Sequence, residues 1–209
     1  MSVKKCFDVA VASVLLVVLF PLLLLIALAV AATSGRPVIY RANRVGRGGK
    51  SFAILKFRTM RRGAAGPAIT GRDDPRITPI GAVLRRTKLD ELPQLVNVLR
   101  GEMSLVGPRP EDPRFVAMYT PEQREVLTIR PGMTSPAAIR FRNEEKLLKT
   151  GEPNFEELYA TTIMPAKLAL DLGYVRQRSF WWDVTILLQS LAVVLRWNGS
   201  EPAAKVAPS

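Results

Sequence analysis

The longest apolar stretch of the chain covers residues 9–32 and is interrupted only by Ser13 and Pro21. At a rise of about 1.5 Å per residue, two dozen residues make a helix long enough to cross the hydrocarbon core of a bilayer. The stretch is also longer than the apolar core of a secretory signal peptide, which has about 7–15 residues. The pattern therefore predicts a membrane element that the mature protein keeps.

Positive charges stand on both sides of this stretch. Lys4 and Lys5 precede it, and four arginines follow within residues 36–47. Positive residues beside a membrane segment favour the cytoplasmic side. A proline inside a helix removes a hydrogen bond and bends the helix, so a break at Pro21 would let the segment enter and leave by one face. A kinked helix that crosses the bilayer is the alternative, and both stay open.

Shorter patterns after residue 36 predict a small mixed domain. Two apolar stretches, residues 38–40 and 52–57, flank a glycine-rich segment at residues 46–49, which is typical of a β-hairpin. The glycine segment lacks the Gly-Lys-Ser/Thr ending of a phosphate-binding loop, so we interpret it as a turn. Residues 81–86 are amphipathic, and residues 103–106 predict a short buried strand.

A central helix is predicted directly after two adjacent acids. Four apolar positions form one helical face, namely Leu92, Leu95, Val96 and Leu99. Gln94 and Asn97 lie off that face. Proline is tolerated only in the first turn of a helix, so Pro93 predicts that the helix begins near Asp90 or Glu91.

The C-terminal part of the chain predicts further helices. Residues 154–163 carry a helical pattern that we expect to break before Pro165, and residues 168–174 form another short element. Residues 179–197 are largely apolar with tryptophans near both ends. This is typical of an amphipathic helix in the membrane interface, and a buried core helix fits the pattern equally. Residues 199–209 are small, polar and proline-containing, and we expect a disordered tail.

Charge and composition narrow the kind of partner. The chain has 209 residues, of which 30 are basic and 18 acidic, and its net charge is +12. This favours an anionic partner: nucleic acid, a membrane surface or a phosphorylated substrate. The only cysteine is Cys6, which excludes an intrachain disulfide framework. The chain has no histidine, so nucleophilic or acid–base chemistry falls to carboxylates.

Asp90 and Glu91 are the best placed carboxylates for such chemistry. Arg85 and Arg86 precede them, and a Gly-Pro-Arg-Pro segment follows at residues 107–110. An arginine held between two prolines loses little conformational entropy when it binds phosphate. Acids at a helix N-terminus also cap free N–H groups without any catalytic role. From the residues alone, both interpretations stay open.

Seven motifs carry a resemblance to a known family. They are Phe7-Asp8 opening the apolar segment that contains Pro21, Arg44-Val45-Gly46, Lys56-Phe57-Arg58-Thr59-Met60, Asp74-Pro75-Arg76-Ile77-Thr78, Leu89-Asp90-Glu91-Leu92-Pro93-Gln94-Leu95, Met103-Ser104-Leu105-Val106-Gly107-Pro108-Arg109-Pro110 and Arg130-Pro131-Gly132-Met133-Thr134. In this order and spacing, over residues 4–195, the chain resembles the bacterial sugar transferases of the monotopic phosphoglycosyl transferase family.

The resemblance implies an α+β protein. Residues 1–35 would form a re-entrant membrane helix-break-helix, with the break at Pro21. Residues 36–198 would form a small, mostly helical catalytic domain at the cytoplasmic membrane face, with a short β-hairpin and interfacial amphipathic helices. Residues 199–209 would be the disordered tail. The implied location is the bacterial inner membrane, bound monotopically.

The implied reaction moves a sugar-1-phosphate from a nucleotide diphosphate sugar, expected to be a UDP-sugar, to undecaprenyl phosphate, and releases nucleoside monophosphate. Asp90 matches the family's nucleophile, which carries a covalent phospho-sugar. Glu91 matches its partner associated with Mg²⁺, and Arg85 matches an arginine near the phosphate. The resemblance extends to four further expected phosphate or acceptor contacts, Lys56, Arg58, Arg76 and Arg109.

The expected partners are the donor, the polyprenol phosphate and the lipid bilayer. Nucleic acid is not expected, and homodimer formation stays open. Residues 135–145 depart from the Gly-Ile-Thr-Gly pattern that many relatives carry after the proline, so the sugar is not assigned. The alternative is a non-catalytic, basic, membrane-anchored protein that binds lipid headgroups or nucleic acid, in which Asp90→Asn would be tolerated.

Overall fold

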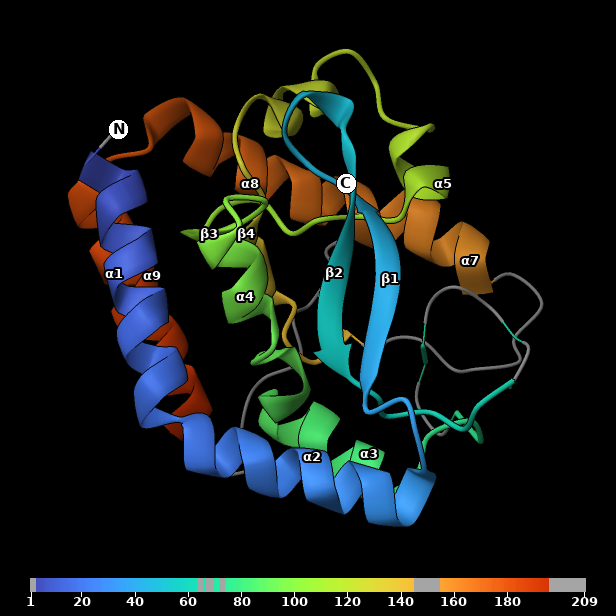
Figure 1. Ribbon diagram of the computed structural model, residues 1–209. Helices are drawn as coiled ribbons and strands as arrows, with labels where there is room; N and C mark the ends of the chain where they lie inside the picture. Colours follow the sequence, from blue (N-terminus) through green and yellow to red (C-terminus); the bar gives the residue numbers. More distant parts are fainter. Residues whose placement is uncertain (1–2, 64–65, 67–69, 72–73, 145–154, 196–209) are drawn as a thin grey trace.

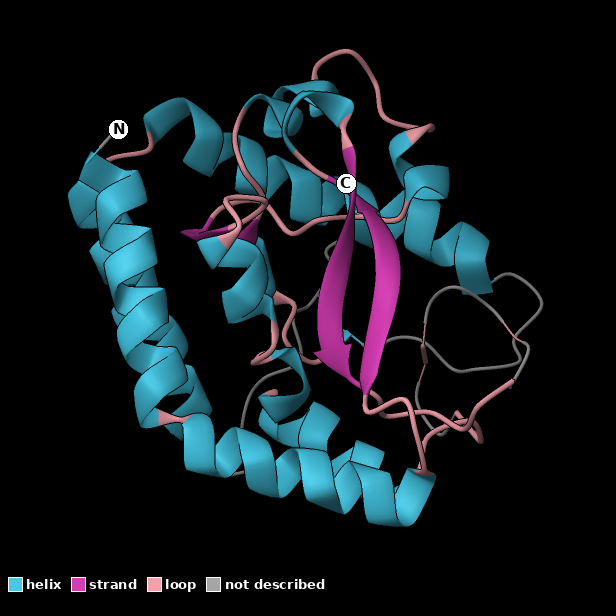
Figure 2. Ribbon diagram, viewed as in Figure 1, coloured by secondary structure: helices cyan, strands magenta, loops and turns pink. Residues whose placement is uncertain are grey.

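The computed structural model describes residues 3–63, 66, 70–71, 74–144 and 155–195 (Figure 1). Within these residues, helices of varied length surround two small sheets of two strands each (Figure 2). The predicted α+β class with mostly helical content is confirmed. The predicted tail at residues 199–209 lies outside the described residues.

The N-terminal apolar stretch forms two helices, α1 (Val3–Val18) and α2 (Phe20–Ser34), which are bent by 64° against each other. Leu19 stands at the break with φ −87° and ψ 0°. Pro21 lies in the first turn of α2 and cannot donate to the carbonyl of Val17, so the two helices do not merge. No single described helix is long and apolar enough to cross a bilayer, whereas the bent pair passes the same length and hydropathy test jointly.

Polar and aromatic contacts dock α1 along the rest of the protein. It lies beside α9 (Phe180–Leu195) in Figure 1. Lys4 forms an ion pair of 2.5 Å with Asp183, and the ring of Phe7 packs edge-on against Phe180. Asp8 is buried and accepts a hydrogen bond of 2.7 Å from the Ser104 hydroxyl. The first half of α1 is therefore held by the same domain that carries the strands.

The predicted hairpin is confirmed and is longer than expected. Strand β1 (Ile39–Val45) pairs antiparallel with β2 (Ser51–Phe57), and the tight turn between them is Arg47–Gly49. A second pair joins β3 (Ser104–Val106) in parallel to β4 (Gly132–Thr134). Beyond β3 the two backbones come very close, because a Cβ on Gly132 would lie 2.1 Å from the Gly107 nitrogen. Glycine is therefore required at this crossing.

The acid pair does not begin the central helix, which corrects the prediction. Helix α3 (Pro79–Thr87) is followed by a separate 3₁₀ turn, Leu89–Glu91, and the α-helix proper, α4, covers Gln94–Leu99. Pro93 occupies the N-cap of α4, which needs no N–H donor.

The predicted buried face of α4 is also wrong. The described burial falls on Gln94, Leu95, Asn97 and Val98, while Leu99 is exposed. The reason is a set of hydrogen bonds to Asn97. Its amide donates to the Ala53 carbonyl at 2.8 Å, and its oxygen accepts from the Leu55 N–H at 3.0 Å. A satisfied polar group can be buried at little cost, so polarity alone did not locate the outer face.

The next elements build the wall opposite the hairpin. In order they are α5 (Pro113–Val116), a 3₁₀ segment (Gln123–Thr128), α6 (Pro136–Arg140), α7 (Phe155–Leu158), a π-helical turn (Tyr159–Ile163) and α8 (Met164–Gln177). The predicted break before Pro165 is wrong. The π turn, with the Met164 N–H bonded to the Tyr159 carbonyl, leads directly into α8, and Pro165 falls in the first turn of that helix.

Helix α9 combines the two interpretations of its sequence. Ile186 is buried against the core, and Asp183 is buried against Lys4. On the outer side, Trp181 is 75% exposed, and Leu188 and Leu191 are exposed as well. One face of α9 therefore packs in the core, and the other face leaves large apolar side chains exposed.

Candidate active site

A cleft of about 700 Å³ opens between the hairpin, the 3₁₀ turn that carries the acid pair, the π-helical turn and α8. Twelve arginines and lysines line it, against five carboxylates. Cationic side chains in a concave site focus a positive potential that attracts anionic ligands. Every predicted site residue lines this cleft. The two acids are Asp90 and Glu91, and the five basic residues are Lys56, Arg58, Arg76, Arg85 and Arg109.

Asp90 is held at the cleft by the turn that follows α3. The helix ends at Lys88, whose φ of 59° is a left-handed conformation that only a few per cent of non-glycine residues adopt. The chain then enters the 3₁₀ turn that contains Asp90. The side chain is 6% exposed, and its Oδ1 has no hydrogen-bond partner among the described residues. Burial raises the pKa of Asp90, and the neighbouring Lys56 and Arg85 oppose that rise.

Glu91 has the opposite environment. Its Oε1 accepts from Lys56 Nζ at 2.7 Å and from Arg109 Nη2 at 2.8 Å. Burial alone would raise the pKa of Glu91, but Arg109 and Lys56 outweigh burial and hold that pKa well below its usual range. Burial lowers the pKa of Lys56, and the charge of Glu91 opposes this. Glu91 is thus a fixed anion between two cations.

The Gly-Pro-Arg-Pro segment presents Arg109 as the sequence predicted, and a buried aspartate that the sequence analysis missed supports it. Asp171 on α8 accepts from the Arg109 backbone N–H at 3.2 Å and from the Ala137 N–H at 3.3 Å. Burial raises the pKa of Asp171 to about 6. The only sequence signal was a single acid within the apolar stretch at residues 168–174.

The remaining predicted basic residues share the cleft and have other contacts as well. Arg76 pairs with Asp74, with Nη2 and Oδ2 2.6 Å apart. The charge of Arg85 adds to the lowering of the Asp74 pKa, which comes first from Arg76, and it opposes the rise of the Asp90 pKa. Arg58 is 7% exposed and donates through Nη2 to the carbonyls of Ser34 and Gly35 at the end of α2.

Arg58 also has spare donors. Its Nε and Nη1 are buried and find no hydrogen-bond partner among the described residues. Buried N–H groups of a guanidinium are costly to leave unpaired. Arg58 therefore fastens the end of α2 to the floor of the cleft and keeps two donors for an incoming acceptor atom.

A polar group on the far wall of the cleft was missed entirely. Lys167 donates to Glu144 at 2.7 Å and to the Tyr159 hydroxyl at 3.2 Å, and that hydroxyl donates to Glu111. Burial raises the pKa of Tyr159 well above its usual value. Tyr159 is the first residue of the π turn and Lys167 lies in α8, and no local sequence pattern predicts that they meet.

The residues of the cleft do not form a metal site on their own. No group of three or more Asp, Glu, Cys or His side chains suited to a metal occurs among the described residues. Mg²⁺ commonly binds through one or two carboxylates together with substrate phosphates and water. Glu91 Oε2 has only a long contact of 3.5 Å with Arg109 Nη1, so it retains capacity for a cation. The site therefore fits a Mg²⁺ ion that enters with a diphosphate.

Comparison with known proteins gives consistent matches. The family model for bacterial sugar transferases matches residues 1–197. A UDP-glucose:undecaprenyl-phosphate glucose-1-phosphate transferase from Caulobacter vibrioides is 39% identical over 197 residues, which are 92% of this chain and 69% of that relative.

Two further relatives agree with these matches. The exopolysaccharide production protein ExoY from Rhizobium meliloti is 36% identical over 216 residues, 94% of this chain and 87% of the relative. A UDP-galactose-lipid carrier transferase from Erwinia amylovora is 35% identical over 214 residues, 94% of this chain and 41% of the relative. Because the family model and these relatives cover nearly all of the chain, the protein belongs to the bacterial sugar transferase family.

Proposed function

We propose that this protein is a phosphoglycosyl transferase that moves a sugar-1-phosphate from a nucleotide diphosphate sugar to undecaprenyl phosphate. The observation that carries the proposal is the buried carboxylate of Asp90: one of its oxygens has no partner among the described residues, of which twelve basic ones line the cleft. The printed names of the relatives supply the substrate classes. We propose a UDP-sugar as donor, and the relatives' names differ in the sugar, so we name none.

The proposed chemistry has two steps through a covalent intermediate. An Asp90 carboxylate oxygen bonds to the phosphorus that carries the sugar. The bond from that phosphorus to the bridging oxygen breaks, and nucleoside monophosphate leaves with the electron pair. An oxygen of the acceptor phosphate then attacks the same phosphorus, and the bond to Asp90 breaks. Each step exchanges one P–O bond for another, so no outside reagent is needed.

Cations around Asp90 would make this attack feasible. Phosphate oxygens repel a carboxylate, and positive groups that neutralise them stabilise the transition state. Lys56 and Arg109 donate hydrogen bonds to the neighbouring Glu91, and Arg85 and Arg58 line the same cleft. We propose that they bind the diphosphate and hold it in line with Asp90.

We propose Glu91 as the protein ligand of a Mg²⁺ ion that the donor brings with it. Such an ion supplies charge neutralisation at the phosphates when bound. The support is the spare capacity of Glu91 Oε2. Release of nucleoside monophosphate should stop in excess chelator and return on addition of Mg²⁺, and undiminished release in chelator would contradict the assignment.

We further propose that α1 and α2 form a re-entrant element in the cytoplasmic leaflet of the bacterial inner membrane. At about 1.5 Å per residue, the 16 residues of α1 reach about 24 Å, which is less than the roughly 30 Å of a bilayer core. Large apolar side chains are exposed around the bend, including Val14, Val17, Val18, Phe20, Leu24, Leu25 and Leu28. A patch of this kind marks a membrane or protein contact.

The deciding experiment follows the phospho-sugar itself. Purified protein is incubated with UDP-sugar labelled in the sugar, without acceptor, and the label on protein is measured together with UMP release. We expect label on the wild type, chased off by undecaprenyl phosphate. Asp90→Asn should lower both readouts by about 10³-fold or more, as expected for loss of a nucleophile.

The matched control is Glu125→Gln, an exposed acid paired with Arg176 away from the cleft, which should react like the wild type. Turnover without any labelled protein, or full turnover by Asp90→Asn, would overturn the covalent mechanism. The non-catalytic lipid- or nucleic-acid-binding alternative predicts no UMP release from any variant.

A further inference from the structure

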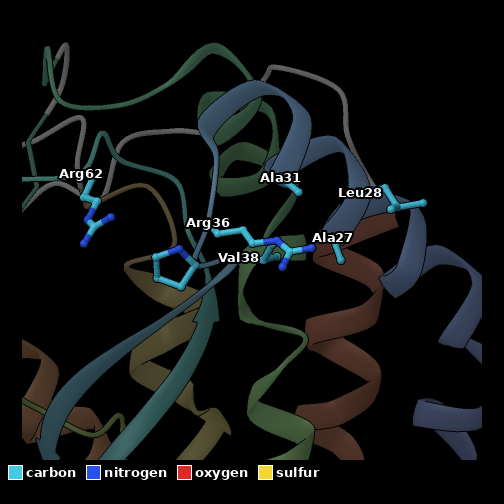
Figure 3. A pocket seen from close by; sticks show the side chains of 7 residues that line it. Ala27, Leu28, Ala31, Arg36, Val38 and Arg62 are labelled. Atoms are coloured by element: carbon cyan, nitrogen blue, oxygen red, sulfur yellow. The ribbon is translucent and has the colours of Figure 1, made fainter.

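A second hollow, separate in position from the acid pair, lies along the C-terminal half of α2. It is shallow and widely open to solvent, with a volume of about 570 Å³. Its walls are apolar on the helix side, where Ala27, Leu28 and Ala31 stand, and on the linker side, where Val38 stands (Figure 3). We call it the α2 groove. Small alanine side chains keep its floor open.

Two arginines border the α2 groove. Arg36 extends from the linker over the groove, and Arg62 is the second arginine that lines it (Figure 3). Both side chains are exposed, and neither makes a hydrogen bond or ion pair with any residue in the described part of the chain. An apolar floor with cations at its rim is complementary to an amphiphile that has a hydrocarbon chain and an anionic head.

The α2 groove adjoins the proposed catalytic cleft. Pro37 and Arg62 line both hollows. Arg58 connects the two regions, because it lines the cleft and donates hydrogen bonds to the carbonyls of Ser34 and Gly35 at the end of α2. Its Nε and Nη1 are buried and have no hydrogen-bond partner among the described residues. An anionic head leaving the groove would meet Arg62 and then the basic cleft.

We propose that the α2 groove holds the first isoprene units of the polyprenyl phosphate acceptor and delivers its phosphate past Arg62 into the cleft. This inference rests on the function proposed above, because it needs a lipid phosphate as second substrate. It goes further, because it assigns a binding surface to the hydrocarbon chain of the acceptor and a route to its phosphate. The donor needs neither, since a sugar nucleotide enters from water.

The test separates the two half-reactions in one pair of variants. Ala31→Phe fills the α2 groove. Ala32→Phe adds the same ring at the next position of the same helix, where the side chain is exposed and does not line the groove. Adduct formation from labelled UDP-sugar is measured without acceptor. Transfer of the label to undecaprenyl phosphate is then measured in detergent and in phospholipid nanodiscs.

We expect Ala31→Phe to form adduct within about twofold of the wild type and to transfer it about tenfold more slowly, with a raised KM for the acceptor, because contacts to several methylene groups are lost. Ala32→Phe should match the wild type in both steps. Equal transfer by the two variants would overturn the proposal. A defect of Ala31→Phe that occurs in nanodiscs and vanishes in detergent would assign the groove to bulk phospholipid and overturn it too.

Folding and the wider function are controlled within the same assay. Adduct formation by Ala31→Phe reports a folded catalytic domain. Should that variant fail to fold, Arg36→Gln removes a rim charge at an exposed position and should slow transfer while sparing adduct formation. Full transfer by Arg36→Gln would then reject the groove. If the wild type forms no adduct, the proposed function fails, and that result differs from any outcome that concerns the groove alone.

Discussion

Asp90 and Glu91 are adjacent in sequence and opposite in electrostatics. Asp90 is buried, one of its oxygens lacks a hydrogen-bond partner in the described part of the chain, and burial raises its pKa. Glu91 is neutralised by Lys56 and Arg109, and its pKa is well below the usual range. Neighbouring acids whose environments drive their pKa values apart are typical of sites in which each acid has its own role. The carboxylate that we propose as the nucleophile thus differs in its environment from the one that balances the charge of two cations.

This difference predicts that Asp90→Asn stabilises the protein or leaves its stability unchanged while removing activity. Because the folded pKa of Asp90 is raised, the ionised form destabilises the fold. The penalty appears as the pH rises from the ordinary value of 3.8 through the raised pKa, and it is complete above that. The midpoint of thermal unfolding of Asp90→Asn should therefore equal or exceed that of the wild type at pH 7.5, with any difference disappearing below about pH 4.

Comparison with Glu91→Gln controls this prediction. Glu91 is stabilised by two cations, so its neutral variant should lose stability at pH 7.5. A marked loss of stability in Asp90→Asn would contradict the account of Asp90.

At the residue scale, the motifs predicted which charged residues line the cleft better than composition did. Asp90, Glu91 and Arg109 carried signals from proline and charge spacing, and all three line it. Tyr159 and Lys167 carried none, because their contact depends on a π turn that no periodicity announces. Contacts that rest on an irregular backbone are the ones that the sequence could not predict.

At the scale of elements, α4 and β2 are joined through one side chain. Asn97 donates to Ala53 and to Glu102 and accepts from Leu55. Without its side chain, the Ala53 carbonyl and the Leu55 N–H of β2 would each lose a hydrogen bond. Periodicity assigned Asn97 to the outer face because it is polar. The helix itself was predicted, but it starts later than expected, and its rotation was set by hydrogen bonds that a hydropathy pattern does not contain.

We therefore predict that Asn97→Leu lowers the free energy of unfolding by about 2–4 kcal/mol, because it leaves buried backbone groups unpaired. Gln94→Leu is the matched control at a neighbouring buried amide. The Gln94 Nε2 has no partner in the described structure, so its removal should cost less than about 1 kcal/mol or stabilise the protein. Chemical denaturation of both variants measures the difference, and equal losses would contradict the assignment.

The proline rule worked at one helix and failed at another. At Pro21 the helix pair is bent at the preceding residues, as predicted. At Pro165 the chain stays helical, because a π turn lies before it and the proline falls in the first turn of α8. A proline limits the hydrogen bonds of a helix, but the packing of neighbouring elements decides whether the axis bends.

At the scale of the whole molecule, the docking of α1 bears on topology. Lys4 contacts Asp183, and Asp8 contacts Ser104, so the start of α1 belongs to the domain that carries the cleft. If α1 spanned a bilayer toward the far side, these contacts would be separated by the membrane. Burying an unpaired Asp8 carboxylate would then be costly.

We predict that Cys6, which is exposed, reacts in spheroplasts with a membrane-impermeant maleimide only after the membrane is permeabilised. Lys50→Cys in a Cys6→Ser background, at the tip of the exposed hairpin turn, gives the cytoplasmic reference. Labelling of Cys6 in intact spheroplasts, with the reference still protected, would establish a spanning helix instead of a re-entrant one.

The pairing of Glu91 with Lys56 and Arg109 has a consequence for how the cleft is filled. Both cations that we propose as phosphate contacts are paired with Glu91, at 2.7 and 2.8 Å. A phosphate that we propose to bind there would replace one anion with another, so we expect its binding to be an ion exchange and not a simple addition. The carboxylate would then be left for the counter-ion that the phosphate carries. Such an exchange leaves no new unpaired charge at these two cations, while the described lining of the cleft keeps its excess of basic side chains for the rest of the anionic substrate.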